Sequence, residues 1–278
     1  ILPVSFLMRI SGKKVIYPFY HFVREHNDVI TKHLYKAKSK EEFTKDIHFF
    51  KKHFQAISLK SLLKKEIEKN KYGFFLSFDD GLSNFYSVVM PILMKEKVFA
   101  INFMNTNFIN NKDLFYRYKV NLLIDRLSKK QLTKEAQKFL KKEIGSVRMN
   151  SDYLKALKHS DTILIDKLCK HLSIDTSKFL KREKPYLTTE QIKYLITNGF
   201  YVGAHSKSHP YYSNLSLKDQ LEETLGSVEV VKNEFQLENL FFSFPFSDAG
   251  VSYDFFKKIE KNNILTFGTA GIEDEIKG

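Results

Sequence analysis

The stretch GFFLSFDDG, residues 73–81, joins a short apolar run to a turn that holds two adjacent carboxylates. The run from Gly73 to Phe78 has the length and composition of a buried strand. In parallel α/β folds, reactive side chains gather where the strands end. Asp79 and Asp80 are therefore candidate site residues.

On both sides of this strand, short apolar runs alternate with amphipathic helices, which predicts an α/β fold with a mostly parallel sheet. A capping box at Ser39 and Glu42 begins one of these helices, with Phe43 and Ile47 on its apolar face. No glycine-rich phosphate loop follows any strand, which favours a distorted seven-stranded (β/α) barrel over an open doubly wound sheet. The seven predicted strands lie at residues 15–23, 56–59, 73–78, 99–104, 200–204, 240–244 and 264–267.

Residues 107–186 interrupt this alternation with three or four predicted helices and no convincing strand. We therefore expect one domain over residues 1–278 with 107–186 as a basic helical insertion. The insertion holds 19 Lys+Arg against 9 Asp+Glu, so it carries +10 of the chain's net charge of +13. A basic surface attracts an anionic polymer or a membrane surface. Only six of the 45 basic residues are arginines, which argues against specific nucleic-acid binding.

Composition and cysteine usage exclude several other classes. A hydrophobic fraction of 43% can form a sizeable core, which excludes a disordered chain. No run of about 18 apolar residues occurs, so we expect no transmembrane helix, and residues 1–8 do not form a signal peptide. A leader could have been trimmed, so localisation stays open. The single cysteine, Cys169, excludes an internal disulfide and a thiolate zinc cluster.

Three of the predicted strands end in polar clusters. Asp79 and Asp80 follow one strand, His205 and His209 follow another, and residues 243–250 follow a third. Two histidines at i and i+4 can meet one ion, and two His with one Asp leave positions open on Zn²⁺ for water and substrate. A simple turn would explain either the carboxylate pair or the histidine pair alone. Finding both at strand ends favours a metal site.

The same three clusters carry a family resemblance. SFDDG at 77–81 resembles the first motif of the polysaccharide deacetylases, the NodB-homology domain of carbohydrate esterase family 4. HSKSHP at 205–210 resembles the second motif, including its trailing proline, and FSFPF at 242–246 resembles the third. Order and spacing agree from about residue 15 to residue 267, outside the insertion. The resemblance implies metal-dependent hydrolysis of N-acetyl groups on a sugar.

Carried over by position, the resemblance implies that Asp80, His205 and His209 hold the metal and that Asp79 is the general base. The implied metal is divalent, with zinc the first choice and cobalt, nickel or iron as alternatives. An amide carbonyl is a poor electrophile, so polarisation by the metal and removal of a water proton both help the attack. The N–H of Phe246 matches the position of the oxyanion donor.

Two departures from the family pattern bear on the mechanism. Ser243 stands where many members carry an arginine that orients the base. No histidine follows His209, so the usual acid near the C-terminus is absent. His21, in a Tyr-His pair at the end of the first predicted strand, resembles the acid of the branch that includes poly-N-acetylglucosamine deacetylases, where the acid-bearing strand comes first. We predict His21 as the general acid, and a structural strand histidine is the alternative.

The leading hypothesis is therefore a metal-dependent deacetylase of an N-acetylated glycan or glycan precursor. It would act at the bacterial cell envelope or in cytoplasmic glycan assembly. The alternative is a carbohydrate-binding homologue that has lost turnover, which the serine at position 243 motivates. A lysine-rich anion-binding protein is a third hypothesis, and its ligand affinity should fall steeply with salt.

Overall fold

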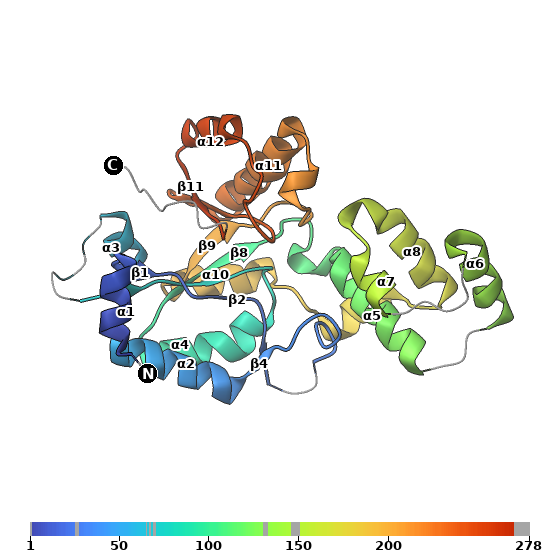
Figure 1. The fold of residues 1–278 in the computed structure, drawn as a ribbon, viewed down its shortest axis with the longest axis horizontal. Coiled ribbons are helices and arrows are strands. Elements are labelled where there is room, and N and C mark those ends of the chain that lie inside the picture. Colours follow the sequence, from blue (N-terminus) through green and yellow to red (C-terminus); the bar gives the residue numbers. More distant parts are fainter. Residues whose placement is uncertain are drawn as a thin grey trace.

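Six short parallel strands form the main sheet in the computed structural model, which describes residues 2–25, 28–64, 66, 68, 71–129, 133–145 and 151–269. The sheet is curled, and helices cover its outer face (Figure 1). Its α/β class and parallel pairing were predicted from the sequence. The strands follow the order β11 (Ile264–Phe267), β10 (Leu240–Ser243), β9 (Tyr201–Ala204), β8 (Ala100–Met104), β7 (Leu76–Phe78) and β2 (Phe19–Tyr20).

The predicted count of seven barrel strands is not confirmed in the described residues. The first predicted strand is divided into β1 (Val15–Ile16), β2 and β3 (Val23–Arg24), with Pro18, which has no N–H, between the first two. The predicted strand at 56–59 is reduced to β5 (Gln55–Ala56), because Ser58 caps helix α3 (Leu59–Leu63). Strands β1 and β5 flank β6 (Gly73–Phe74) in a separate three-stranded sheet, and β3 pairs with β4 (Lys38–Ser39).

The inner face of the curled sheet is filled by aromatic and aliphatic side chains. Phe75, Ile101, Phe103 and Phe241 belong to one buried cluster below the strand ends. Tyr17 and Phe267 come from the two edges of the sheet, and their ring centroids lie 6.4 Å apart. In the part of the chain that the structure describes, no ladder joins β11 to β2. Aromatic packing therefore brings these edges together without closing a barrel.

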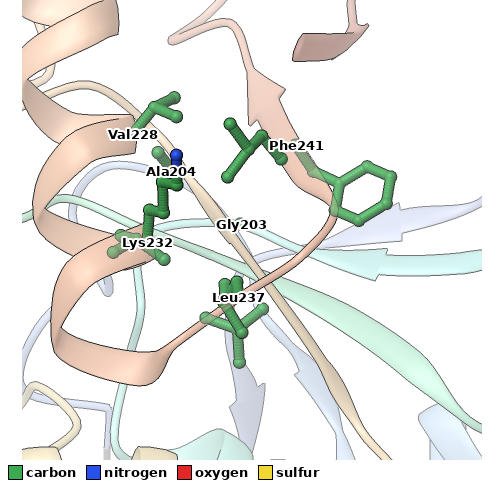
Figure 2. Close-up of a pocket in the computed structure, with 9 residues that line it drawn as sticks. Gly203, Ala204, Val228, Lys232, Leu237 and Phe241 are labelled. Atoms are coloured by element: carbon green, nitrogen blue, oxygen red, sulfur yellow. The ribbon is translucent and has the colours of Figure 1, made fainter. Parts of the chain in front are cut away.

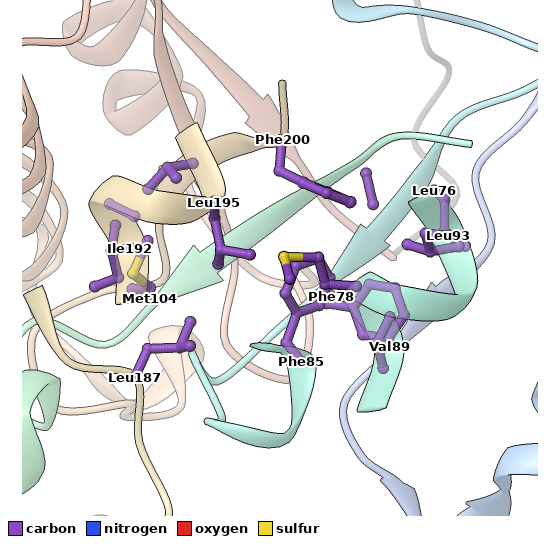
Figure 3. Close-up of a cluster of buried hydrophobic side chains, with 14 of the residues drawn as sticks. Leu76, Phe78, Phe85, Val89, Leu93, Met104, Leu187, Ile192, Leu195 and Phe200 are labelled. Carbon is purple, nitrogen blue, oxygen red and sulfur yellow. The ribbon is translucent and has the colours of Figure 1, made fainter. Parts of the chain in front are cut away.

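The outer face of the sheet packs against the helices and forms the largest buried cluster (Figure 3). Phe78 and Met104 from the strands meet Phe85, Leu195 and Phe200 there. The predicted capping box is confirmed at Ser39–Glu42, and a second one forms at Thr188–Gln191. The helices that contribute to this cluster are α1 (Val4–Ser11), α2 (Lys40–His53), α4 (Met90–Glu96), α10 (Thr189–Thr197), α11 (Leu217–Phe235) and α12 (Tyr253–Glu260).

The described residues between 107 and 186 form mainly helices, which make a lobe beside the sheet (Figure 1). Their described part holds five α-helices, more than predicted, and these surround a second buried cluster. The chain leaving the lobe pairs with the turn after Asp80: Leu187 N–H donates to Gly81 O at 2.9 Å and Ser83 N–H to Pro185 O at 2.8 Å. The helices are α5 (Tyr116–Lys129), α6 (Lys134–Ile144), α7 (Ser151–Ala156), α8 (Thr162–His171) and α9 (Thr176–Glu183).

A small recess lies between α11 and strands β9 and β10 (Figure 2). Val228, Leu237 and Phe241 are among its apolar lining residues, and Lys232 is its only charged one. None of the predicted site residues lines it. This recess is a packing feature between helix and sheet.

Among the described residues, every helix is too short or too polar to span a lipid bilayer.

The core packing of α2 generates a stability prediction. Phe43 is fully buried and packs edge-on against Tyr20 and Phe78, whereas Phe49 on the same helix is 46% exposed. Phe43→Ala should lower the free energy of unfolding by about 3–5 kcal/mol, because it leaves a cavity under the sheet. Phe49→Ala, the matched control, should cost about 1 kcal/mol or less. Urea unfolding measures both, and equal losses would contradict the assignment of this helix face.

Candidate active site

Three loops meet at the C-terminal ends of β7, β9 and β10, as the sequence predicted for these strands. Asp79 and Asp80 follow β7, and Phe246 lies in the loop after β10. His205 follows β9 directly, and His209 lies one turn further on. Because the strands are parallel and near neighbours in one sheet, their loops share one edge, and residues far apart in sequence come together there.

Asp80, His205 and His209 form a buried cluster whose ligand atoms all lie within 4.8 Å of one another. Asp80 Oδ1 is 3.2 Å from His209 Nε2 and 3.7 Å from His205 Nε2. Donors about 2.1 Å from a tetrahedral ion lie about 3.4 Å apart, so these separations fit a shared metal. Asp80 Oδ1 and His205 Nε2 are buried without a hydrogen-bond partner in the described chain, which a metal would satisfy. Two nitrogens and one oxygen suit zinc, and they also suit cobalt, nickel or iron.

The backbone of Ser243 orients one of these candidate ligands. His205 Nδ1 lies 2.8 Å from the carbonyl oxygen of Ser243. Because a carbonyl only accepts, Nδ1 is the protonated nitrogen, and Nε2 keeps its lone pair toward Asp80. Burial, joined by the charge of His209, lowers the pKa of His205 to about 3, so the ring is neutral. This is the form in which histidine binds a metal.

The carboxyl groups of Asp79 and Asp80 differ in their surroundings. Burial raises the pKa of Asp79 to about 7, while the charge of His21 and a hydrogen bond from Ser243 lower it. Burial also raises the pKa of Asp80, but the charge of His209, joined by that of His21, outweighs it and holds this pKa below its ordinary value. Asp80 is therefore ionised at neutral pH, whereas a pKa of about 7 lets Asp79 take up and release a proton there.

Four residues in the loops after these strands adopt left-handed backbone conformations, which residues other than glycine rarely adopt. Their φ angles are 72° at Asp80, 67° at Ser206, 62° at His209 and 60° at Phe246. Such conformations cost of order 1–3 kcal/mol each and persist only where the surroundings hold them. Their concentration at this edge of the sheet is typical of a functional site.

The histidine loop is held by residues that the sequence analysis missed. Asn105, at the end of β8, donates its amide to the carbonyl oxygen of His205. Glu223 on α11 accepts from the N–H groups of Lys207 and Ser208 at 2.8 and 2.9 Å. Asn105 and Glu223 both lie outside the three motifs. The sequence therefore contained no signal that they would contact the histidine loop.

His21 lies one residue beyond β2, on the strand that pairs with β7. Tyr20 is the register partner of Phe78, and Asp79 N–H donates to Tyr20 O at 2.9 Å, so His21 and Asp79 extend from neighbouring strand ends. The His21 ring is half-buried, with the ring centroids of Phe19 and Tyr35 at 5.9 and 6.1 Å. Its role as acid stays a prediction.

Phe246 contributes a ring as well as a backbone group. Its ring lies edge-on to His209, with centroids 4.6 Å apart, and stacks on Tyr211 at 3.7 Å. Its N–H enters no hydrogen bond in the part of the chain that is described. The sequence predicted a role only for this N–H, because the packing of the ring against a candidate ligand depends on tertiary structure.

The insertion contacts the candidate site directly. Tyr118 on α5 donates its hydroxyl to Asp80 Oδ2 at 2.8 Å. The ring of Phe115, just before α5, lies 4.4 Å from that of His209. Tyr118 and Phe115 are both buried, and nothing in the local sequence pattern distinguishes them from core aromatics.

Residues 66–263 match the sequence model of the family described as polysaccharide deacetylase. The chain therefore belongs to the polysaccharide deacetylase family, as its three motifs predicted. No curated protein sequence gives a significant match.

Solved structures of three deacetylases or relatives share the fold. PplD, a Streptococcus pyogenes deacetylase solved in complex with acetate, has 15% identity and a TM-score of 0.54, covering 90% of this chain and 80% of its own. IcaB from Ammonifex degensii has 13% identity and a TM-score of 0.55, covering 92% and 84%. A de-N-acetylase from Aggregatibacter actinomycetemcomitans has 12% identity and a TM-score of 0.54, covering 92% and 88%.

The three-residue cluster generates a metal-binding prediction. His209→Ala removes one of three donors and should abolish retention of Zn²⁺ after gel filtration, measured by elemental analysis. His48→Ala is the control, because His48 lies on α2 with 60% of its side chain exposed, and this variant should retain the metal. Zinc retention by His209→Ala equal to that of the unmodified protein would contradict the site.

Proposed function

We propose that the protein hydrolyses N-acetyl groups of an N-acetylated sugar polymer or its precursor in a metal-dependent reaction, releasing acetate. The observation that carries the proposal is the position of Asp79 beside the Asp80–His205–His209 cluster, at the strand ends of a polysaccharide deacetylase fold. Family membership supports the reaction class, and the donor set of the cluster supports the metal dependence.

Asp80, His205 and His209 would hold the metal. Bound there, a divalent ion would polarise the acetyl carbonyl and make a water molecule more acidic. The backbone carbonyl of Ser243 and the hydroxyl of Tyr118 fix the orientation of two of the three donors before any ion arrives. Such preorganisation of the ligands is what a metal site of useful affinity requires.

Asp79 would act as the general base. As water attacks the carbonyl carbon, a C–O bond forms and Asp79 accepts the water proton. The oxyanion that develops needs a donor, and the N–H of Phe246 would supply one from its left-handed turn. The hydroxyl of Ser243, whose proximity lowers the pKa of Asp79, would orient the base where other family members use an arginine.

His21 would act as the general acid. When the C–N bond breaks, the sugar nitrogen departs as a neutral amine only if a proton reaches it, because an amide anion is too basic to leave. Histidine is the side chain whose ordinary pKa suits this transfer near neutral pH. The position of His21 on the strand paired with β7 supports this role.

The experiment that tests the function is acetate release from N-acetylglucosamine oligomers, with and without added Zn²⁺, Co²⁺ or Ni²⁺. Metal-dependent acetate release, lost in Asp79→Asn, is the expected result. A protein that binds the metal and the oligomer but releases no acetate would instead be the carbohydrate-binding homologue with lost turnover. In that case Ser243→Arg would be the first substitution to test for a gain of turnover.

The acid assignment generates a kinetic prediction. His21→Ala should keep the metal and the substrate affinity while lowering kcat for the amide about 10²- to 10⁴-fold. The loss should be much smaller for an activated aryl acetate, because a phenolate leaves without a proton. Stopped-flow or steady-state kinetics on both substrates measures the difference. His48→Ala should leave both rates unchanged, and near-normal amide turnover by His21→Ala would contradict the role.

The basic insertion generates a prediction about an anionic partner, either a polymer or a membrane surface. Lys119 forms ion pairs with Asp113 and Asp166. Exposed lysines on α6 include Lys138, Lys141 and Lys142. Changing these three exposed lysines to glutamate should weaken action on an anionic or lipid-linked glycan, measured against salt, and spare a short neutral oligomer. Equal losses on both substrates would mean that α6 has only a structural role.

A further inference from the structure

The hydrogen bond between Tyr118 and Asp80 joins the insertion to the metal cluster. Tyr118 lies on α5, within residues 107–186, and none of the three family motifs includes it. Its hydroxyl donates to Asp80 Oδ2 at 2.8 Å, and both side chains are at most 5% exposed. A phenol is protonated at neutral pH, so the hydroxyl is a donor and the carboxylate an acceptor.

The two oxygens of Asp80 therefore face different partners. Oδ2 accepts the tyrosine proton, whereas Oδ1 has no hydrogen-bond partner in the described residues and lies near the Nε2 atoms of His205 and His209. With Oδ2 held in this way, the carboxylate cannot rotate freely about its terminal bond. Oδ1 therefore stays available to a metal, whereas Oδ2 is turned toward Tyr118.

We infer that Tyr118 is a positioning residue for the metal site, an inference that rests on the proposed function. It sets the orientation of Asp80 and compensates for the charge of the carboxylate oxygen that does not face the ion. The insertion therefore supplies part of the metal site in addition to any contact with the substrate polymer.

Neighbouring aromatic residues hold Tyr118 in place. Its ring packs edge-on against Phe115, with centroids 5.1 Å apart, and Phe115 in turn contacts His209. The hydroxyl of Tyr186 accepts from the N–H of Phe115 at 2.9 Å, which fixes the start of α5. The ring of Phe115 thus contacts both the tyrosine and one of the histidines, which links α5 to the histidine loop.

Tyr118→Phe is the direct test, because it removes one oxygen and keeps the ring and its packing. Partners of metal-binding side chains typically change affinity 10- to 100-fold when they are lost. We expect the affinity for Zn²⁺, measured by competition with a chromogenic chelator, to fall by about that factor. The visible spectrum of the Co²⁺ form should also change, because the carboxylate is freer to reorient.

Tyr116→Phe is the matched control on the same helix. The hydroxyl of Tyr116 is buried without a hydrogen-bond partner among the described residues, so its loss should leave metal affinity and the Co²⁺ spectrum unchanged. Urea unfolding of the two metal-free variants measures their free energies of unfolding, so that a loss of stability can be told apart from a loss of metal affinity. A Tyr118→Phe variant with unmodified metal affinity and spectrum would overturn the inference, whatever its stability.

The result is separable from the proposed function. If the unmodified protein binds Zn²⁺ but releases no acetate, the deacetylase proposal fails while the comparison of the two variants still decides the role of Tyr118. If acetate is released and the two variants bind Zn²⁺ equally, the deacetylase proposal stands and the positioning role is wrong.

Discussion

The burial of the Asp80 carboxylate is the constraint on which the rest of this site depends. A charged group removed from water is costly unless complementary partners surround it, and Asp80 is 5% exposed. The chain meets only part of this requirement: a phenol donates to one oxygen, whereas two imidazoles lie beside the other without donating a hydrogen bond to it. Because these partners come from α5 and from the loop after β9, the fold has to bring distant segments to one strand end. The same arrangement leaves Asp80 Oδ1 and His205 Nε2 without protons or hydrogen bonds, which is the condition that a metal ion satisfies.

Strain and support are distributed around this carboxylate in a consistent way. Asp80 and His209 have left-handed backbones, which would relax in a loosely held loop. The chain leaving the insertion pairs with the turn at residues 81–83, and Glu223 fixes the histidine loop through two N–H groups. The insertion is therefore a separate lobe that also lines one side of the candidate site. Its helices pack around their own cluster of buried side chains, and the ion pair of Lys119 with Asp166 joins α5 to α8.

Local patterns predicted what short stretches of sequence encode by themselves. The strand before Asp79, the capping boxes and the i, i+4 histidine pair are local features, and the parallel class followed from their alternation. The number of barrel strands was not confirmed, because Pro18 and the Ser58 cap divide or shorten runs that look continuous in apolarity. Tyr118, Asn105 and Glu223 were missed for a different reason. Periodicity predicts which face of an element is buried, but the partner that a buried polar group meets depends on tertiary packing across dozens of residues.

The placement of the two proposed proton-transfer residues follows from the register of two strands. Tyr20 is paired with Phe78, so His21 and Asp79 are the next residues on neighbouring parallel strands. β2 is also an edge strand of the main sheet, which leaves His21 half-buried while Asp79 is 7% exposed. A base that works next to a metal benefits from exclusion of bulk water, whereas an acid has to regain a proton from solvent after every turnover. The edge position of β2 supplies that access, which supports the proposed role of His21 as the acid.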